Sequence, residues 1–522
     1  MMPKPKKKKK KAVRLPGQLD NCELCGKRFT VTPYSKAGPA GGLLCPKCSK
    51  LAKDDEKARQ KATAAAGGRK KVTPRARRRQ IESDRLMGDV QPGAKSLLDC
   101  CVRKVADVVN DVDDFGDMPQ RLLDRLSQIL SKKRVLTPRI LNLFLRSDSD
   151  TIDVYDSAKL EEEDFQRIFA HMPHVVSVNL RFAGQMKDGP LRHLADKCTR
   201  LRHLQLGAAN LISDAAWTDF FVQRGDQLES LKLSELNDSL RHDTVLTLVQ
   251  HCRQLRRLKL RSCAHMTDAS VAALASLTQL EHLTLSVATE TTTTETLNQL
   301  IVALGPNLRT LCLESFDHAD DSTLGAIHTH CRRLSKLRLT GSSQCTDAAF
   351  AALLAPSWPN PALVHVDLSS NRDVDEVRAD TSGGLTATND PTAGTIIGFG
   401  SAAFRALMRH SGRALRRLDL HSNRHIALNA LLDVFNNNNN GRVSAGAATK
   451  YPALRDIDLS FVPSVDDVVM RAIFRSCPSL KKLALFACFN ARAAAASIPA
   501  GVAVIGLPNA HDNIVQGDDQ GR

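Results

Sequence analysis

The chain has 522 residues, of which 42% are hydrophobic and 4% aromatic, and its formal net charge is +17. This length exceeds an ordinary single globular domain, so it predicts either several domains or a repeat array. No run of 18 apolar residues and no signal-peptide hydrophobic region follows the N-terminal lysines, so we expect an intracellular protein without a membrane span. In that compartment the 14 cysteines favour metal ligands and buried thiols over disulfides.

The positive charge is concentrated at the N-terminus. Residues 1–95 hold 26 Lys or Arg against 8 Asp or Glu, and the rest of the chain is close to neutral. We predict a disordered basic tail at residues 1–19 and a basic linker at residues 51–95. Dense basic blocks favour nucleic-acid binding or nuclear import, and the alternative is a solvated tail that aids solubility. The candidate residues are Lys6, Lys7, Lys8, Lys9, Lys10, Lys11, Arg75, Arg77, Arg78 and Arg79.

Residues 20–50 contain two C-x2-C pairs separated by 19 residues, and the four cysteines are Cys22, Cys25, Cys45 and Cys48. This spacing is typical of a four-thiolate tetrahedral zinc site, here two knuckles with tight turns at Gly26 and Pro46. The segment is too short to form an apolar core, so we predict that structural Zn²⁺ supplies its folding free energy. A RING ubiquitin-ligase module needs eight ligands and is excluded, and four unrelated free thiols are the alternative.

Residues 96–146 change to a helical pattern. Leu97, Cys101 and Val105 recur at i, i+4 and i+8, which is one stripe of a helix. A second leucine stripe follows, and Pro138 is suited to the first turn of a third helix. The simplest interpretation is a small helical region that caps the N-terminal edge of a repeat array.

The start of this region also matches a short adaptor-binding motif. Residues 96–105 fit S/T-L-x3-C-x3-aliphatic, and in this they resemble the elongin-C-binding box. The resemblance implies that Leu97 and Cys101 enter a pocket on that adaptor, with Val105 as the third aliphatic position. Met118 and the residues after it lie where related receptors carry a cullin-contacting helix. From these residues alone, adaptor box and ordinary capping helix are both open.

From residue 172 onward the unit L-x-x-L-x-L recurs eleven times. The first steps between copies are 25 to 29 residues, within or at the edge of the leucine-rich-repeat range of about 20–29. The copies begin at Val175, Leu201, Leu228, Leu255, Leu280, Leu308, Leu334, Leu363, Leu415, Leu454 and Leu480. The alternating leucines predict short parallel strands with helices packed outside them, and one unit can bury its apolar face only against its neighbours. We therefore predict an α/β leucine-rich-repeat solenoid of about 11 repeats over residues 172–510.

Cysteines recur at fixed places in these repeats. Cys252 precedes a strand, Cys263 follows it, and Cys198, Cys331 and Cys477 occupy places matching Cys252. The pattern resembles the cysteine-containing leucine-rich-repeat class, which is common in ubiquitin-ligase substrate receptors. We interpret the thiols themselves as small buried apolar groups.

Two insertions, at residues 373–403 and 436–450, interrupt the period and predict flexible loops. The strand residues beside the fourth motif position should be exposed on the concave face. That face changes from basic to acidic along the array, which favours a polar protein partner over bare DNA for the whole surface, and solubility is the alternative. The candidate partner residues are Lys232, Arg257, Lys259, Lys336, Arg338, Asp367, Asp419 and Asp458.

The chain contains no P-loop, nucleophile elbow, H-E-x-x-H motif or Gly-rich dinucleotide fingerprint. We therefore predict a protein that is not an enzyme and has no small-molecule substrate.

Taken in order, the motifs are similar to those of one family. The runs Cys22-Glu23-Leu24-Cys25-Gly26-Lys27-Arg28-Phe29-Thr30 and Gly41-Gly42-Leu43-Leu44-Cys45-Pro46-Lys47-Cys48 resemble the N-terminal motif of the fungal Rad-seven DNA repair proteins. The resemblance implies global-genome nucleotide excision repair, in which the chain pairs with a Swi/Snf-type ATPase and acts as substrate receptor of an elongin-C and cullin ubiquitin ligase. It also favours the adaptor box at Leu97 and Cys101.

Three functional hypotheses follow. The first is a non-catalytic nuclear repair factor whose basic arm docks to damaged DNA or chromatin and whose solenoid holds the ATPase or a substrate. The second is a leucine-rich-repeat substrate receptor of a ubiquitin ligase unrelated to DNA repair. The third is a scaffold without a ligase, which would tolerate Leu97→Asp and Cys101→Asp.

Overall fold

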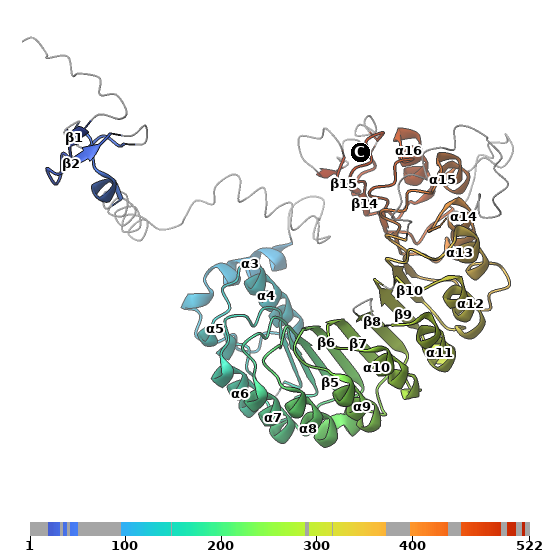
Figure 1. Ribbon diagram of the computed structural model, residues 1–522, viewed down its shortest axis with the longest axis horizontal. Coiled ribbons are helices and arrows are strands. Elements are labelled where there is room, and N and C mark those ends of the chain that lie inside the picture. Colours follow the sequence, from blue (N-terminus) through green and yellow to red (C-terminus); the bar gives the residue numbers. More distant parts are fainter. Residues whose placement is uncertain are drawn as a thin grey trace, which may run out of the picture. The chain divides into compact units, whose positions relative to one another are not determined.

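The computed structural model describes residues 19–31, 35–38, 42–50, 96–147, 149–287, 292–315, 317–371, 397–436, 450–491, 498–507 and 514–516. The chain divides into two compact units, residues 1–83 and 84–522 (Figure 1). Most of both predicted insertions lies outside the described residues, as do the basic residues Lys6 to Lys11 and Arg75 to Arg79.

The N-terminal unit is a small hairpin with a short helix. Strands β1 (Leu19–Asn21) and β2 (Arg28–Thr30) pair antiparallel, and residues 46–50 are helical. Among its described residues the apolar cluster consists of five side chains, which are Cys22, Leu44 and Cys45 with Phe29 and Cys48 packed against them. A cluster of this size cannot offset the chain entropy lost on folding, which agrees with the expected dependence on a metal.

The second unit opens with a helical edge made of α3 (Leu97–Asp107), η1 (Val109–Asp111), α4 (Gln120–Lys132) and α5 (Pro138–Asn142). The predicted start of the third helix is confirmed, because Pro138 occupies its first turn and the Thr137 side chain accepts the amide of Ile140. Leu126 and Leu130 of α4 are buried in the main core, and Leu123 is buried as well. The leucines after Met118 therefore belong mostly to the core of this edge.

The rest of the unit is a curved array with the strands on the inside and the helices on the outside (Figure 1). Strands β3 to β15 form one parallel sheet in chain order, and β16 adds to β15 antiparallel. The strands are β3 (Thr151–Val154), β4 (Ser177–Leu180), β5 (His203–Gly207), β6 (Ser230–Leu236), β7 (Arg257–Cys263), β8 (His282–Val287), β9 (Thr310–Glu314), β10 (Lys336–Thr340), β11 (His365–Asp367), β12 (Arg417–Asp419), β13 (Asp456–Asp458), β14 (Lys482–Ala484), β15 (Ala503–Ile505) and β16 (Ile514–Gln516).

One helix or helical turn follows almost every strand and covers its outer side. The helices are α6 (Glu162–His171), α7 (Asp188–Lys197), α8 (Asp214–Arg224), α9 (His242–His251), α10 (Asp268–Ala273), α11 (Thr294–Leu304), α12 (Asp321–His330), α13 (Asp347–Leu353), α14 (Ser401–Ser411), α15 (Leu428–Phe435) and α16 (Asp467–Ser476), with 3-10 turns η2 (Gly225–Gln227), η3 (Leu274–Ser276) and η5 (Gly305–Asn307). This is the leucine-rich-repeat solenoid that the sequence predicts.

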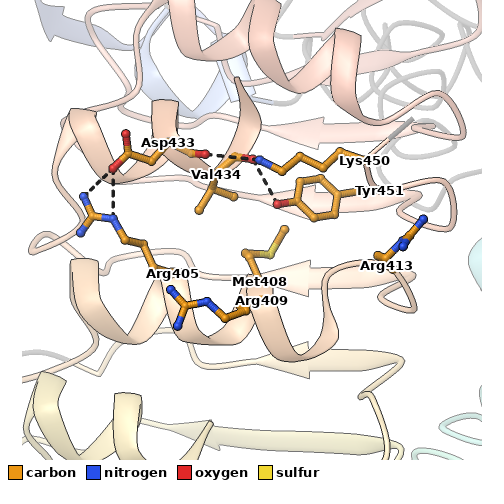
Figure 2. Close-up of a pocket in the computed structure, with 8 residues that line it drawn as sticks. All are labelled: Arg405, Met408, Arg409, Arg413, Asp433, Val434, Lys450 and Tyr451. Atoms are coloured by element: carbon orange, nitrogen blue, oxygen red, sulfur yellow. Dashed lines mark hydrogen bonds and ion pairs between the residues drawn. The ribbon is translucent and has the colours of Figure 1, made fainter. Parts of the chain in front are cut away.

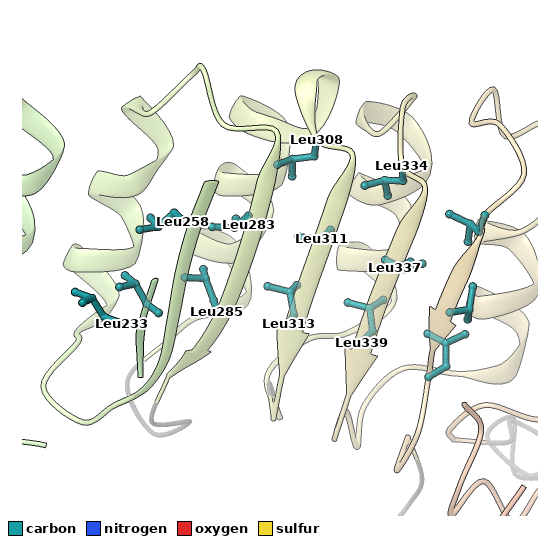
Figure 3. Close-up of a cluster of buried hydrophobic side chains, with 14 of the residues drawn as sticks. Leu233, Leu258, Leu283, Leu285, Leu308, Leu311, Leu313, Leu334, Leu337 and Leu339 are labelled. Atoms are coloured by element: carbon teal, nitrogen blue, oxygen red, sulfur yellow. The ribbon is translucent and has the colours of Figure 1, made fainter. Parts of the chain in front are cut away.

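The motif leucines form the core of the array. In β9, Leu308 precedes the strand while Leu311 and Leu313 lie within it, and all three are at most 1% exposed. Figure 3 shows how each leucine stacks on its equivalent in the next repeat, for example Leu311 beside Leu337. Each repeat is thus stabilised mainly by its two neighbours.

The sheet extends beyond the eleven predicted copies at both ends. β3 precedes residue 172 and contributes Ile152 and Val154 to the core, whereas β15 contributes Val504. Around β15 glycines occupy the positions of two motif leucines, since Val504 pairs with Leu483 and Gly501 and Gly506 flank it at the motif spacing. The leucine pattern is lost there although the strand geometry persists.

The repeat cysteines are buried, as expected. Burial raises the pKa of Cys252 and of Cys331 to about 12, so both thiols are protonated at neutral pH. A Cβ added to Gly225 would lie 2.8 Å from the Cys252 sulfur, so these thiols fill a close contact between repeats. Their role is packing.

Candidate metal centre and partner-binding surfaces

The four cysteines of the N-terminal unit converge on one point. Cys22 and Cys25 flank the turn between β1 and β2, while Cys45 and Cys48 lie at the start of the helical residues 46–50. All four sulfur atoms lie within 4.8 Å of one another. The Cys25 and Cys45 sulfurs are 3.8 Å apart, and tetrahedral zinc with Zn–S bonds of about 2.3 Å also requires roughly 3.8 Å. The residues therefore fit a structural zinc ion.

The backbone around the cluster explains the glycines of this segment. Gly26 has φ +66° and donates its amide to the Cys22 carbonyl, which closes the turn of the first cysteine pair. A Cβ at Gly42 would meet the Glu23 carboxylate, which accepts the Gly42 amide. The second pair differs from the expected second knuckle, because Pro46 begins a helix instead of a turn. Proline is favoured there, since the first helical residue needs no N–H partner.

Close contacts within the cluster shift the pKa values of Cys22 and Cys48 in opposite directions. The backbone amide of Cys45, whose nitrogen is 3.3 Å from the Cys22 sulfur, lowers the pKa of Cys22 to about 6. The neighbouring Cys25 and Cys45 thiols raise the pKa of Cys48 to about 12. Four thiolates at this distance repel one another, and a divalent cation removes that repulsion. Zn²⁺ bound here would hold the hairpin and the short helix together.

Helix α3 presents two different faces. Its inner face packs on α4 through Val102 and Ala106, and Asp99 forms a 2.6 Å ion pair with Arg125. Ser96 caps the helix by accepting the Asp99 amide at 3.1 Å. These contacts fix the direction in which the remaining side chains point.

The outer face of α3 is apolar and exposed. Leu97 is 81% exposed, Leu98 is 54% exposed, and Cys101 is exposed as well. Val105, the third residue of the predicted stripe, is half-buried against the main core. The structure therefore brings Leu97 and Cys101 together on an uncovered surface and places Val105 at its inner edge.

The predicted concave residues occupy two columns of the sheet. Register places Lys232, Lys259, Arg338, Asp367, Asp419 and Asp458 in one column, and Arg257 and Lys336 in the other. Burial, together with nearby Arg257 and Lys259, lowers the pKa of Lys232.

The middle of the concave face is neutralised internally. Arg338 contacts Asp367 at 2.5 Å and Glu314 at 2.6 Å, and Arg261 contacts Glu314 at 2.7 Å. Glu314 and Arg261 each follow the last leucine of their motif. The sequence pattern predicts only the residues beside the fourth motif position as concave, so it misses these two. Arg338 and Asp367 are consequently less available to a partner than their charges suggest.

The acidic end of the face is only partly balanced. Asp419 and Asp458 are register neighbours on β12 and β13. His421 lies 2.9 Å from Asp419, and this hydrogen bond raises the pKa of His421. Burial, with Asp419 nearby, raises the pKa of Asp458. A cation from a partner would stabilise this pair of carboxylates.

A hollow of about 510 Å³ lies between α14 and α15 and is lined mostly by groups that hydrogen-bond one another (Figure 2). Arg405 pairs with Asp433 at 2.8 Å. The Lys450 ammonium contacts the carbonyl oxygens of Asp433 and Val434 in the last turn of α15, and the Tyr451 hydroxyl donates to Val434. Cations at a helix C-terminus offset its partial negative charge. These contacts fasten α15 and give the hollow a structural role.

Within the described segments, no helix combines the length and the apolar content that crossing a bilayer requires.

Fold and metal site together define a class: a leucine-rich-repeat solenoid with an N-terminal four-cysteine zinc unit. Residues 16–54 match a family model described as the DNA repair protein rhp7 treble clef domain. The chain is 29% identical over 475 residues to DNA repair protein rhp7 of Schizosaccharomyces pombe, covering 90% of this chain and 75% of that protein. It is 23% identical over 442 residues to DNA repair protein RAD7 of Saccharomyces cerevisiae, covering 80% and 70%. The chain is therefore homologous to the Rad7/rhp7 DNA repair proteins, as its motifs predict.

A solved structure has the same fold. The crystal structure of the Rad7 and Elc1 complex in yeast matches with a TM-score of 0.62 and 21% identity, over 88% of this chain and 98% of that one. This likeness supports the solenoid architecture described above.

Proposed function

We propose that the chain is a non-catalytic nuclear factor in global-genome nucleotide excision repair. In this proposal it acts in damage recognition with a Swi/Snf-type ATPase and serves as substrate receptor of an elongin-C and cullin ubiquitin ligase. Homology to two proteins named as DNA repair proteins supports the repair role. The N-terminal basic residues would dock to damaged DNA or chromatin, and Zn²⁺ on the four cysteines would hold the adjacent unit folded.

The observation that carries the ligase half of the proposal is the exposed stripe of Leu97 and Cys101. A solvated leucine beside a second apolar side chain loses water contact when a partner covers it, and burying one leucine contributes about 1.5–3 kcal/mol. The inner face of α3 is held by Val102 and Asp99, so the stripe is presented on a rigid helix. The structural neighbour is a Rad7–Elc1 complex, which supports an elongin C as the occupant.

The first experiment is affinity purification of tagged full-length protein with mass spectrometry. The wild type should recover elongin C, a cullin and a Swi/Snf-type ATPase. Leu97→Asp/Cys101→Asp should lose elongin C and the cullin but keep the ATPase, because only the stripe on α3 is changed. Cys100→Asp is the matched control, since Cys100 is an exposed cysteine on the same helix and lies outside the stripe.

Recovery of elongin C by the double variant, or its loss in Cys100→Asp, would contradict the assignment of the stripe. Recovery of neither elongin C nor the ATPase by the wild type would contradict the function as a whole.

The second candidate is a ubiquitin-ligase receptor without a role in DNA repair. The exposed α3 stripe supports this function equally, because it says nothing about the substrate. Deleting residues 1–80 separates the two. The repair function predicts loss of chromatin association, whereas the alternative predicts unchanged association and an intact ligase. A scaffold without a ligase would retain its function in Leu97→Asp/Cys101→Asp.

A further inference from the structure

The residues immediately before strands β5 to β14 form a continuous row along one edge of the solenoid, which we call the rim row. In each case the backbone amide donates to the carbonyl of the preceding member, so neighbours in the row are neighbours in space. In order, the members are Arg202, Glu229, Arg256, Glu281, Arg309, Ser335, Val364, Arg416, Arg455 and Lys481.

In the first half of the rim row, positive and negative side chains largely balance one another. Cations and carboxylates alternate there, and they pair across adjacent strands. Arg202 lies 3.0 Å from Glu229, and Glu281 contacts Arg309 at 3.0 Å and Arg256 at 4.0 Å. These arginines have intramolecular partners, so this part of the rim attracts no particular ion.

The second half of the rim row lacks carboxylates. Arg416, Arg455 and Lys481 are exposed on three adjacent strand starts, and none has an ion pair among the described residues. The loops that enter β10 to β14, residues 330–336, 355–365, 411–417, 450–455 and 476–482, contain ten cations and no Asp or Glu. The cations are Arg332, Arg333, Lys336, Arg413, Arg416, Arg417, Lys450, Arg455, Lys481 and Lys482.

The edge of the solenoid that carries this second half of the rim row also contains a cavity. A cavity of about 600 Å³ opens between these strand starts, and its lining includes five cations and two carboxylates. The cations are Lys336, Arg338, Arg416, Arg417 and Arg455. Of the carboxylates, Asp367 is paired with Arg338, and Asp456 follows Arg455 in the chain. His365 lies in the same cavity, and burial together with Lys336 and Arg416 lowers its pKa. Arg413 extends the basic surface toward α14, where it lies at the opposite end of the hollow from the Arg405–Asp433 pair (Figure 2).

We propose that this basic rim over β10 to β14 binds the phosphate backbone of double-stranded DNA. The inference deepens the proposed function and rests on its DNA-repair half, because it assigns to the solenoid a DNA contact separate from the N-terminal basic residues. The acidic inner column through Asp419 and Asp458 would repel phosphates, so the duplex is expected along the edge and not within the concave face.

The dimensions and composition of the rim favour duplex DNA over other anions. Five strands spaced about 4.8 Å apart place its cations over roughly 19 Å, and a duplex presents about ten charges over that length. The aromatic side chains of these loops, Trp358 and Tyr451, are at most 4% exposed, so no stacking platform for single-stranded bases is present in the described loops. The same lack of exposed aromatic anchors disfavours an acidic protein partner.

The test is fluorescence anisotropy of a labelled 30-base-pair duplex with full-length protein. The rim variant is Arg416→Gln/Arg455→Gln/Lys481→Gln. The matched control is Arg202→Gln/Arg256→Gln/Arg309→Gln, which removes three positive charges from the same row where carboxylates already neutralise them. Thermal melting of each variant checks that it is folded, and all six residues are exposed.

The rim variant should bind on the order of tenfold more weakly near 0.1 M salt, and its slope of log affinity against log salt should fall by roughly 2.7, because about 0.9 is lost per phosphate contact. The control should stay within about twofold of the wild type. Equal weakening in both variants would mean a general charge effect and would overturn the proposal. So would an unchanged affinity in the rim variant.

The same test in a chain without the N-terminal basic residues distinguishes failure of this proposal from failure of the proposed function. Lys6 to Lys11 and Arg75, Arg77, Arg78 and Arg79 are changed to Ala in the full chain, and both triple variants are repeated. Residual duplex binding that the rim variant removes supports the rim. If this chain loses all duplex binding, and the rim variant has no effect in the otherwise wild-type chain, the proposed DNA contact of the rim is overturned. The DNA-repair role is then unaffected. If the rim variant weakens the binding of poly-glutamate as much as it weakens the binding of the duplex, the rim would instead be assigned to an acidic protein.

Discussion

At the scale of single residues, the zinc site depends on four cysteine side chains, and no further Cys, His, Asp or Glu of the described residues joins their cluster. We expect Cys48→Ser to abolish zinc binding, because a serine hydroxyl replaces one thiolate of a closed tetrahedral set. Metal analysis of the purified full-length chain should find about one zinc per wild-type chain and almost none in the variant. Cys100→Ser is the control, since Cys100 lies outside the cluster. Zinc retained by Cys48→Ser, or lost from Cys100→Ser, would contradict the site.

His421 makes the stability of the acidic end of the concave face depend on pH. Its hydrogen bond to Asp419 raises the pKa of His421 in the folded chain. The protonated form is therefore favoured by folding, and its contribution is complete below the unfolded pKa of about 6.5. It is lost as the pH rises through the higher folded pKa.

We accordingly expect the melting temperature of the wild type, relative to His421→Gln, to fall as the pH rises above about 6.5. Thermal melts of both proteins between pH 5 and pH 9 would measure this difference. His251→Gln serves as the control, because His251 ends α9 on the outer side of the array. A difference that stays constant across the range, or that grows with pH, would show that the Asp419 contact does not favour the charged imidazole.

At the scale of elements, the leucine motif predicts β4 to β14 because each strand needs the same three apolar positions. It fails at β3 and β15, where Ile152 and Val504 keep the packing but the leucine spacing is lost. The α3 pattern predicts a helix, yet which face is covered depends on α4 through Val102 and the Asp99–Arg125 pair. The four cysteines converge as their spacing predicts, whereas the pairing of Arg338 with Glu314 needs the register between strands.

Helix α14 is positioned by a buried carboxylate of the preceding repeat. Asp347 accepts the amides of Gly400 at 3.0 Å, Ala402 at 3.0 Å and Ala403 at 2.8 Å, which are the unpaired N–H groups at the start of α14. We expect Asp347→Ala to lower the free energy of unfolding by about 1–3 kcal/mol, because three backbone donors, two of them in buried contacts, lose their acceptor. Urea unfolding followed by circular dichroism would measure the loss.

The control for this prediction is Asp347→Asn, which keeps one carbonyl oxygen in nearly the same place and should cost less than the alanine change. Amide hydrogen exchange should rise first in α14 in the alanine variant. Equal stability of Asp347→Ala and wild type would mean that α14 is fixed by its apolar face through Phe404 and Leu407 alone.

At the scale of the whole molecule, charge and packing in the solenoid vary along the order of its repeats. The zinc unit has its own small cluster of side chains, and the solenoid has a single continuous core from α3 to the last strands. Along that core the rim row changes from the paired arginines before β5 to β9 to the cations before β12 to β14, which have no ion pair among the described residues. The inner column changes from basic to acidic. Different partners can therefore occupy the two halves without competing for the same surface.

In a one-dimensional array of repeats, a destabilising core substitution should affect mainly the repeats next to it. Leu311 in β9 and Leu483 in β14 are both fully buried, and each is in register with the equivalent residue of the two adjacent strands. Replacing either with alanine should cost about 2–5 kcal/mol through lost burial and the cavity left behind. Because coupling passes only between neighbours, Leu311→Ala should accelerate amide exchange in β8 to β10, and Leu483→Ala should do so in β13 to β15. Exchange measured by mass spectrometry distinguishes the two patterns. A uniform rise along all the strands in both variants would instead mean that the solenoid opens as one cooperative unit.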